Sequence, residues 1–196
     1  MVITYFGKQF FRINHGDLTV ALNPVGKTRF GSDVVLVSAR TPDYNQVELA
    51  SFGDKKPFVI SGPGDYEVAS IPVSGFLTEV DLNKKKIINT VYSLVIDEIK
   101  ICFLGSAQEL PNNIREAIEE TDIVFVSVGD DPQKAYKLAV SLDPKIIIPM
   151  EFDPSGKEIK TFLKEGSAKV EPVEKLTLKR KDLQDKESEI IILKAS

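Results

Sequence analysis

The apolar segments of this 196-residue chain follow two different rhythms, and the change between them limits the folds that the chain can adopt. Up to about residue 104, short β-branched runs separated by turns predict strands. Beyond that point, segments with apolar residues at helical spacing alternate with further apolar runs, which predicts strands connected by helices. This order favours two β-rich halves packed together with helices outside. The predicted strands are 2–6, 9–13, 18–22, 34–37, 57–60, 66–69, 71–75, 90–96, 100–104, 123–128, 145–148, 176–178 and 189–193, the predicted helices are 111–120, 132–142 and 156–164, and 83–86 is predicted to be a solvated hairpin tip or loop.

Residue counts exclude several classes of function. One cysteine excludes an internal disulfide framework and a cysteine-rich zinc module, and one histidine excludes any site that needs two imidazoles. The net charge of −4 provides no long-range attraction for nucleic acid or for an anionic membrane. No segment approaches the roughly 20 apolar residues that span a bilayer, and no targeting signal is visible. We therefore expect a cytoplasmic protein without a nucleic-acid or membrane partner, which binds a small molecule or a protein and could form a homo-oligomer.

Polar residues follow several of the predicted strands. In open α/β sheets, ligands collect beyond the carboxyl ends of the strands, so the loops at those ends are the expected place for a site. If the loops converge, they present carboxylates and hydroxyls without an imidazole. The side chains in question are Asp43, Ser106, Asp130, Asp131 and Glu151, with Arg40 as the cation.

Several segments, in this order and at this spacing, resemble the metallo-β-lactamase-fold proteins. The resemblance is closest to a short branch of zinc-dependent hydrolases that also contains the ascorbate-phosphate lactonase-like proteins. It implies an α+β fold, an αββα sandwich of four layers with two mixed sheets and helices outside. It also implies one domain over 1–196, made of two pseudo-repeated halves at about 1–97 and 98–196. The matching segments include GPGDYEV at 62–68, NTVY at 89–92, ICFLG at 101–105 and PKIIIPM at 144–150, together with 3–13, 22–24, 33–38, 170–172 and 175–177.

The same resemblance implies a dinuclear zinc site at the strand ends, and here the chain departs from the pattern. The family's His-x-His-x-Asp-His signature falls on Ala39, Thr41, Asp43 and Tyr44, its bridging aspartate on Ser106 and its last histidine on Glu151. We interpret these six positions as a vestigial metal site and predict no catalytic residue and no cofactor. A weak divalent-cation site at Asp43 and Glu151 remains open. Tyr44 is predicted to fill space that a metal and its imidazole would occupy, and to reach a neighbouring carboxylate with its hydroxyl.

Other reactive residue types have simpler interpretations. His15 lies in a predicted turn and is expected to face solvent. Cys102 alternates within an apolar run and is expected to be a core residue. Ser106 has no histidine nearby that could activate it as a nucleophile, so a structural role is favoured.

Two main hypotheses about function follow. The first is a degenerate, metal-free and non-catalytic member of the hydrolase family that acts as a binding or scaffold protein. The alternative is a metal-dependent hydrolase of a lactone, an ester or a phosphorylated sugar, with an atypical carboxylate site at Asp43 and Glu151. A third option is a purely structural subunit of an oligomer.

Overall fold

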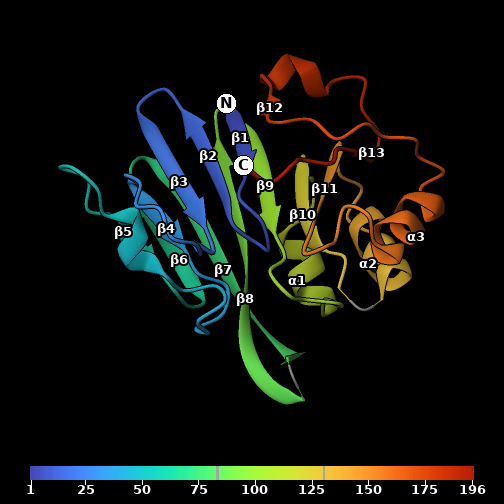
Figure 1. The fold of residues 1–196 in the computed structure, drawn as a ribbon, viewed down its shortest axis with the longest axis horizontal. Helices are drawn as coiled ribbons and strands as arrows, with labels where there is room; N and C mark the ends of the chain where they lie inside the picture. The colour runs from blue at the N-terminus through green and yellow to red at the C-terminus, as the bar shows by residue number, and fades with distance from the viewer. Residues whose placement is uncertain (83, 130) are drawn as a thin grey trace.

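The computed structural model describes residues 1–82, 84–129 and 131–196, and its strands form two mixed sheets (Figure 1). The six-stranded sheet has the order β12-β1-β2-β3-β4-β5, and the seven-stranded sheet has the order β13-β11-β10-β9-β8-β7-β6. The first sheet contains β1 (Val2–Tyr5), β2 (Phe11–His15), β3 (Leu18–Leu22), β4 (Val34–Leu36), β5 (Phe58–Ile60) and β12 (Leu176–Thr177). The second contains β6 (Gly64–Val68), β7 (Ile71–Leu82), β8 (Lys85–Ile96), β9 (Ile99–Phe103), β10 (Ile123–Ser127), β11 (Ile146–Met150) and β13 (Glu189–Ile190).

The main core lies between the two sheets, and the alternation of side chains along the strands places it there. In β2, Phe11 and Ile13 are fully buried, whereas Arg12 between them faces the other side of the sheet and is half-buried. The Phe11 ring from the first sheet meets the Phe125 ring from the second edge-on, with 4.7 Å between the ring centroids. Burial of each such ring stabilises the fold by about 2–3 kcal/mol.

Helices cover the outer face of the second sheet. The chain forms α1 (Asn112–Ala117), α2 (Pro132–Val140) and α3 (Lys157–Glu165), and side chains from all three join one apolar cluster with β9, β10 and β11. In α2, the Asp131 side chain caps the first turn by accepting a hydrogen bond from the Lys134 N–H. None of the helices in the described part of the chain is long and apolar enough to cross a membrane.

The outer face of the first sheet carries loops and short helical turns instead. The segment between β3 and β4 and the 3-10 helix η1 (Val47–Ala50) cover a smaller apolar cluster there, and a second 3-10 helix, η2 (Arg180–Leu183), follows β12. The predicted α+β sandwich of two mixed sheets is confirmed, and its α-helices within the described residues come from the second half of the chain.

Three details differ from the sequence predictions. Strands β7 and β8 are longer than expected and pair through ten residue pairs, the last of which joins Leu82 to Lys85. Lys85 and Lys86 therefore lie in a strand, because the ladder between the two strands outweighs the low strand propensity of lysine. Asn83 lies outside the described residues. Helix α1 has only six residues, fewer than the predicted 111–120.

The parallel strands bring the site together. Strands β9, β10 and β11 run in parallel and in register, and β3 and β4 are also parallel, so the carboxyl ends within each set lie at one edge. Strands β6, β7 and β8 belong to the second sheet, so the change of sheet falls between β5 and β6. The two pseudo-repeated halves, about 1–97 and 98–196, stay a prediction.

Candidate functional site

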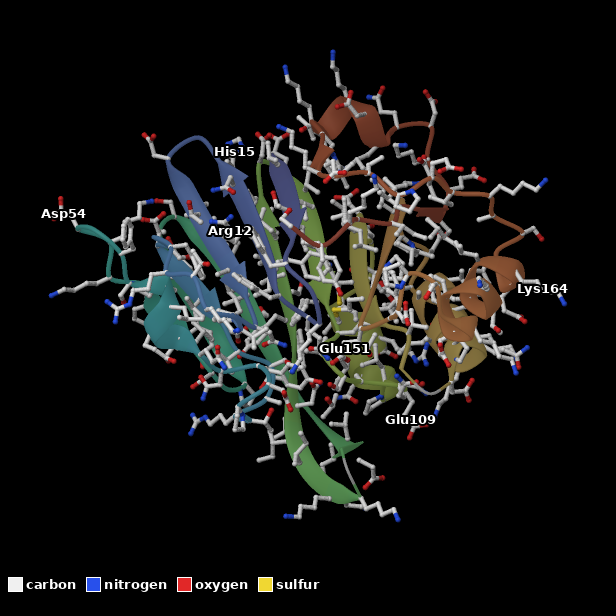
Figure 2. The ribbon with its side chains drawn as sticks, viewed as in Figure 1. Arg12, His15, Asp54, Glu109, Glu151 and Lys164 are labelled. Carbon is white, nitrogen blue, oxygen red and sulfur yellow. The ribbon has the colours of Figure 1, made fainter. Side chains whose placement is uncertain are left out.

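Glu151 is the centre of a polar network at the ends of the strands. It follows β11 directly, and its backbone adopts a left-handed conformation with φ of 56°. Its carboxylate accepts hydrogen bonds from the Tyr44 hydroxyl at 2.5 Å, from Gln9 Nε2 at 2.7 Å and from the Ser127 hydroxyl at 2.7 Å. Figure 2 shows Glu151 in the middle of the molecule, between the strands of the two sheets. Both carboxylate oxygens are therefore engaged by neutral donors.

The network continues from Glu151 into the first sheet through Gln9, which is fully buried. Gln9 Nε2 also donates to the Ser106 hydroxyl at 2.9 Å, and Gln9 Oε1 accepts from Asn23 Nδ2 at 2.7 Å. Asn23 is also fully buried; its Nδ2 reaches the Ser38 hydroxyl at 2.8 Å, and its Oδ1 accepts from the Ser38 N–H at 2.8 Å. Buried polar groups need such partners, because each unpartnered group costs about 1–3 kcal/mol.

A second buried amide, that of Asn89 in β8, holds the loop after β9. Asn89 Oδ1 accepts from the Ser106 N–H at 3.0 Å, and its Nδ2 donates to the Leu104 carbonyl at 3.1 Å. The residue between them, Gly105, has a φ of 58°, and a Cβ atom added there would lie 2.4 Å from Asn89 Oδ1 and 2.8 Å from the Ser38 Cβ. Only glycine fits this close approach of the two sheets.

Two buried tyrosines border the carboxylate. Tyr44 is 3% exposed, and burial together with the nearby Glu151 carboxylate raises the pKa of its hydroxyl above the ordinary value. Burial also raises the pKa of Tyr5 to about 12, and its hydroxyl donates to the Lys8 carbonyl at 2.8 Å. Both hydroxyls therefore keep their protons at neutral pH and act as donors. The Tyr44 hydroxyl bonds a carboxylate, as the sequence predicts, and the idea that its ring fills the space of a metal and its imidazole stays a prediction.

A cavity of about 650 Å³ opens beside Glu151. Its lining residues include Tyr44, Ser106, Ser127 and Phe152. Hydrogen bonds from the Ser155 N–H and hydroxyl lower the pKa of the Asp153 carboxyl. The charged residues that line the cavity are Asp81, Asp131, Glu151, Asp153 and Glu158 against Lys134, whose Nζ lies 3.2 Å from Glu109 Oε2.

The structure brings together some of the predicted positions and separates others. Tyr44, Ser106, Asp131 and Glu151 line the same cavity. Asp43 does not line it among the described residues; its Oδ1 lies 2.5 Å from Lys8 Nζ in a half-exposed ion pair. Ala39 is buried, Thr41 and Arg40 line a different cavity of about 430 Å³, and Asp130 lies outside the described residues.

The histidine and the cysteine lie away from this network. His15 is exposed at the far end of β2, with its Nδ1 3.7 Å from Asp97 Oδ2, and Gln9 lies before the other end of that strand. Cys102 is fully buried in β9, and burial raises the pKa of its thiol to about 12. Both placements agree with the sequence interpretation.

Sequence reasoning missed the amide and hydroxyl partners that hold Glu151. Gln9 lies in the turn between β1 and β2, Asn23 follows β3 directly and Ser127 ends β10. A weak signal was available, because each is a polar residue next to an apolar strand. Such residues are usually exposed at strand ends, so only the packing of the two sheets shows that they are buried.

Solved structures with the same fold come from several organisms. A Thermotoga maritima protein, assigned as a Zn-dependent hydrolase of the metallo-beta-lactamase superfamily, is 26% identical with a TM-score of 0.76, over 98% of this chain and 97% of that one. Igni18, a metallo hydrolase from Ignicoccus hospitalis, is 17% identical with a TM-score of 0.64, over 91% of this chain and 99% of that one. CmlA, a diiron beta-hydroxylase from Streptomyces venezuelae, is 13% identical with a TM-score of 0.60, over 98% of this chain and 52% of that one. The chain matches no curated protein sequence.

These similar structures contradict the prediction that the chain has no cofactor, because they are described as Zn-dependent, as a metallo hydrolase and as a diiron enzyme. The residues at the strand ends do not fit the dinuclear zinc site that the resemblance implies. Glu151 is engaged by three neutral donors and Asp43 by Lys8, and within the described ranges no group of three or more His, Cys, Asp and Glu side chains is placed so that it could hold a metal ion. The groups that would hold a metal are therefore not shown.

A family model gives the most direct assignment. Residues 2–151 match the model described as the beta-lactamase superfamily domain, and this range is about three quarters of the chain. The matched range includes the whole network from Gln9 to Glu151. The chain therefore belongs to the beta-lactamase superfamily of metallo-beta-lactamase-fold hydrolases.

Proposed function

We propose that this chain is a non-catalytic member of its family that binds a positively charged small molecule in the cavity beside Glu151. The observation that carries the proposal is the hydrogen bonding of the Glu151 carboxylate, which accepts from Tyr44, Gln9 and Ser127. These bonds orient a negative charge toward a cavity of about 650 Å³, a size that suits a small ligand.

Hydrolysis would require a group that takes a proton from water or activates it by another route. Glu151 already accepts three hydrogen bonds within the network, and Asp43 is paired with Lys8. His15, the only imidazole in the sequence, lies at the far end of β2. These contacts favour a role for the Glu151 carboxylate as a fixed negative charge over a role as the base that takes a proton from water.

The charge around the cavity favours a cation. Five acidic side chains line it against one lysine, and that lysine is 3.2 Å from the carboxylate of Glu109. Walls of one charge sign raise the local concentration of oppositely charged ligands. Tyr44 and Phe152 also line the cavity, and aromatic rings attract an ammonium group.

Calorimetric titration with 1,4-diaminobutane tests this proposal, with butane-1,4-diol as the neutral probe of matched length. We expect saturable binding of the diamine, weakening at higher salt, and no binding of the diol. Glu151→Gln should weaken diamine binding at least tenfold. Glu116→Gln, which makes the same change of charge on α1, should leave it unchanged. Equal binding of the two probes, or an unchanged affinity in Glu151→Gln, would contradict the proposal.

An activity assay addresses the alternative of a hydrolase with a carboxylate site. Chromogenic lactones, esters and phosphodiesters are offered to the protein with and without added Zn²⁺ or Mn²⁺. We expect no turnover above that of the Glu151→Ala variant. Turnover that disappears in Glu151→Ala or Asp43→Ala would overturn the proposal in favour of the hydrolase.

A further inference from the structure

A second pocket lies on the opposite face of the first sheet, around Arg12. Arg12 is in β2 and faces away from the main core, in the part of the molecule where Figure 2 labels it. The guanidinium carbon of Arg12 lies 4.0 Å from the centroid of the Phe6 ring and 5.3 Å from that of Phe30. The two rings therefore hold the flat guanidinium group in one orientation.

The side chains that line this pocket carry an excess of positive charge. Arg12, Lys27 and Arg29 line a space of about 190 Å³, and no acidic side chain lines it among the described residues. Ser196 also lines the pocket, and its N–H donates to the Tyr5 carbonyl at 3.0 Å. The protein as a whole carries a net charge of −4, so this cationic pocket contrasts with the rest of the chain.

One donor of Arg12 has no partner. Its Nε atom is buried, and no described residue accepts its hydrogen bond. Burial lowers the pKa of the Arg12 guanidinium below its ordinary value, which shows that the surroundings disfavour its charge. An anion bound to the terminal nitrogens of the guanidinium group would supply the opposite charge.

We propose that this pocket binds a phosphate group, either as free phosphate or as the phosphate of a small monoester. The planar fork of arginine matches two phosphate oxygens at once, and Lys27 and Arg29 at the rim favour a dianion over a carboxylate. A volume of about 190 Å³ corresponds to the share of about six water molecules, enough for a phosphate with a small substituent. This site is separate from the cavity beside Glu151 and does not depend on its function.

Titration calorimetry at constant ionic strength tests the proposal with inorganic phosphate, phenyl phosphate and acetate. Both phosphate probes should bind saturably, and acetate should bind at least tenfold more weakly. Tighter binding of phenyl phosphate than of inorganic phosphate would identify a monoester that uses the phenylalanine rings, whereas equal affinities would identify free phosphate.

Single substitutions test whether phosphate binds in the pocket around Arg12. Arg12→Gln should weaken phosphate binding at least tenfold. Arg12→Lys, which keeps the positive charge and a side chain of similar length, should weaken it less. Arg29→Gln, on an exposed loop where folding is not at risk, should weaken it about threefold. Arg115→Gln on α1 makes the same change of charge elsewhere and should have no effect. Absence of saturable phosphate binding, acetate binding as tight as phosphate binding, or an unchanged affinity in both Arg12→Gln and Arg29→Gln would overturn the proposal.

Discussion

Asn23 in the first sheet and Asn89 in the second make the same contact in different surroundings. Each is fully buried, and each uses its Oδ1 to accept the backbone N–H of a residue in the loop after the next strand along the chain. For Asn23 the donor is Ser38, at 2.8 Å, and for Asn89 it is Ser106, at 3.0 Å. Both amides therefore fix the place where a strand-end loop begins.

The two amides differ in what their Nδ2 groups hold. Asn89 donates to the Leu104 carbonyl and to the Thr78 hydroxyl, which lie within the scaffold of the second sheet. Asn23 donates to the side chains of Gln9 and Ser38, and Gln9 donates in turn to Glu151. The Nδ2 group of Asn89 therefore bonds only the scaffold of the second sheet, whereas that of Asn23 bonds Gln9, the partner of Glu151. The following predictions test this difference.

The largest effect is expected where the two amide networks approach each other, at Gly105. Gly105→Ala would place a Cβ 2.4 Å from Asn89 Oδ1 in a left-handed backbone, and we expect a loss of about 3–4 kcal/mol in the free energy of unfolding. Gly129→Ala is the matched control, because its φ of 53° is similar but its nearest added contact is Gln108 Nε2 at 3.2 Å; about 1 kcal/mol is expected. Urea unfolding measures both, and equal losses would show that crowding at Gly105 is unimportant.

Alanine substitutions at Asn23 and Asn89 distinguish an effect on the stability of the fold from an effect on binding at the candidate site. Asn23→Ala leaves the buried Ser38 N–H without its acceptor, and Asn89→Ala does the same to the part-buried Ser106 N–H and to the Leu104 carbonyl, so each should lower the free energy of unfolding by about 2–3 kcal/mol. Only Asn23→Ala should also weaken diamine binding, because it releases the carbonyl end of Gln9. Calorimetry on both variants checks this, and a loss of binding in Asn89→Ala alone would reverse the assignment of roles.

The ionisation of the Tyr44 hydroxyl should make the free energy of unfolding depend on pH in the alkaline range. Its folded pKa is raised above the ordinary 10.0, so the folded state keeps the proton when the unfolded state loses it. The contribution of this raised pKa to the free energy of unfolding is full below pH 10. It declines as the pH rises above 10, by about 1.4 kcal/mol per pH unit for each such tyrosine. Tyr5, with a pKa raised to about 12, adds to the same decline. Tyr44→Phe should reduce the slope between pH 10 and 12 by about 1 kcal/mol per unit in urea unfolding, and an unchanged slope would contradict the burial of its hydroxyl.

The smallest effect is expected at the predicted ligand position that the structure places outside the network. Asp43→Asn breaks an ion pair in which both side chains are about half exposed, so less than about 0.5 kcal/mol should be lost. Diamine binding should not change, because Asp43 does not line the cavity in the described part of the chain. A loss of binding as large as that of Glu151→Gln would place Asp43 in the site after all.

Sequence patterns were sufficient for much of the fold and for part of the site. Tyr44, Ser106 and Glu151 were predicted from the family pattern, and they line one cavity. Asp43 comes one residue before Tyr44, yet it points to Lys8 instead. A loop of this kind has no regular period, so neighbouring residues in it can face different surroundings, and no pattern distinguishes them.

Local regularities in the chain determine where its strands and helices lie, and their order agrees with two mixed sheets. The apolar alternation in β2 and the Asp131 cap of α2 are examples, because each depends on residues only a few positions apart. The partners of Glu151 depend on packing between distant segments, since Gln9 lies 142 residues and Tyr44 lies 107 residues from it along the chain. A polar side chain at a strand end is exposed or buried according to what packs over it. Whether it is solvated or bonded to a buried carboxylate therefore depends on the tertiary structure.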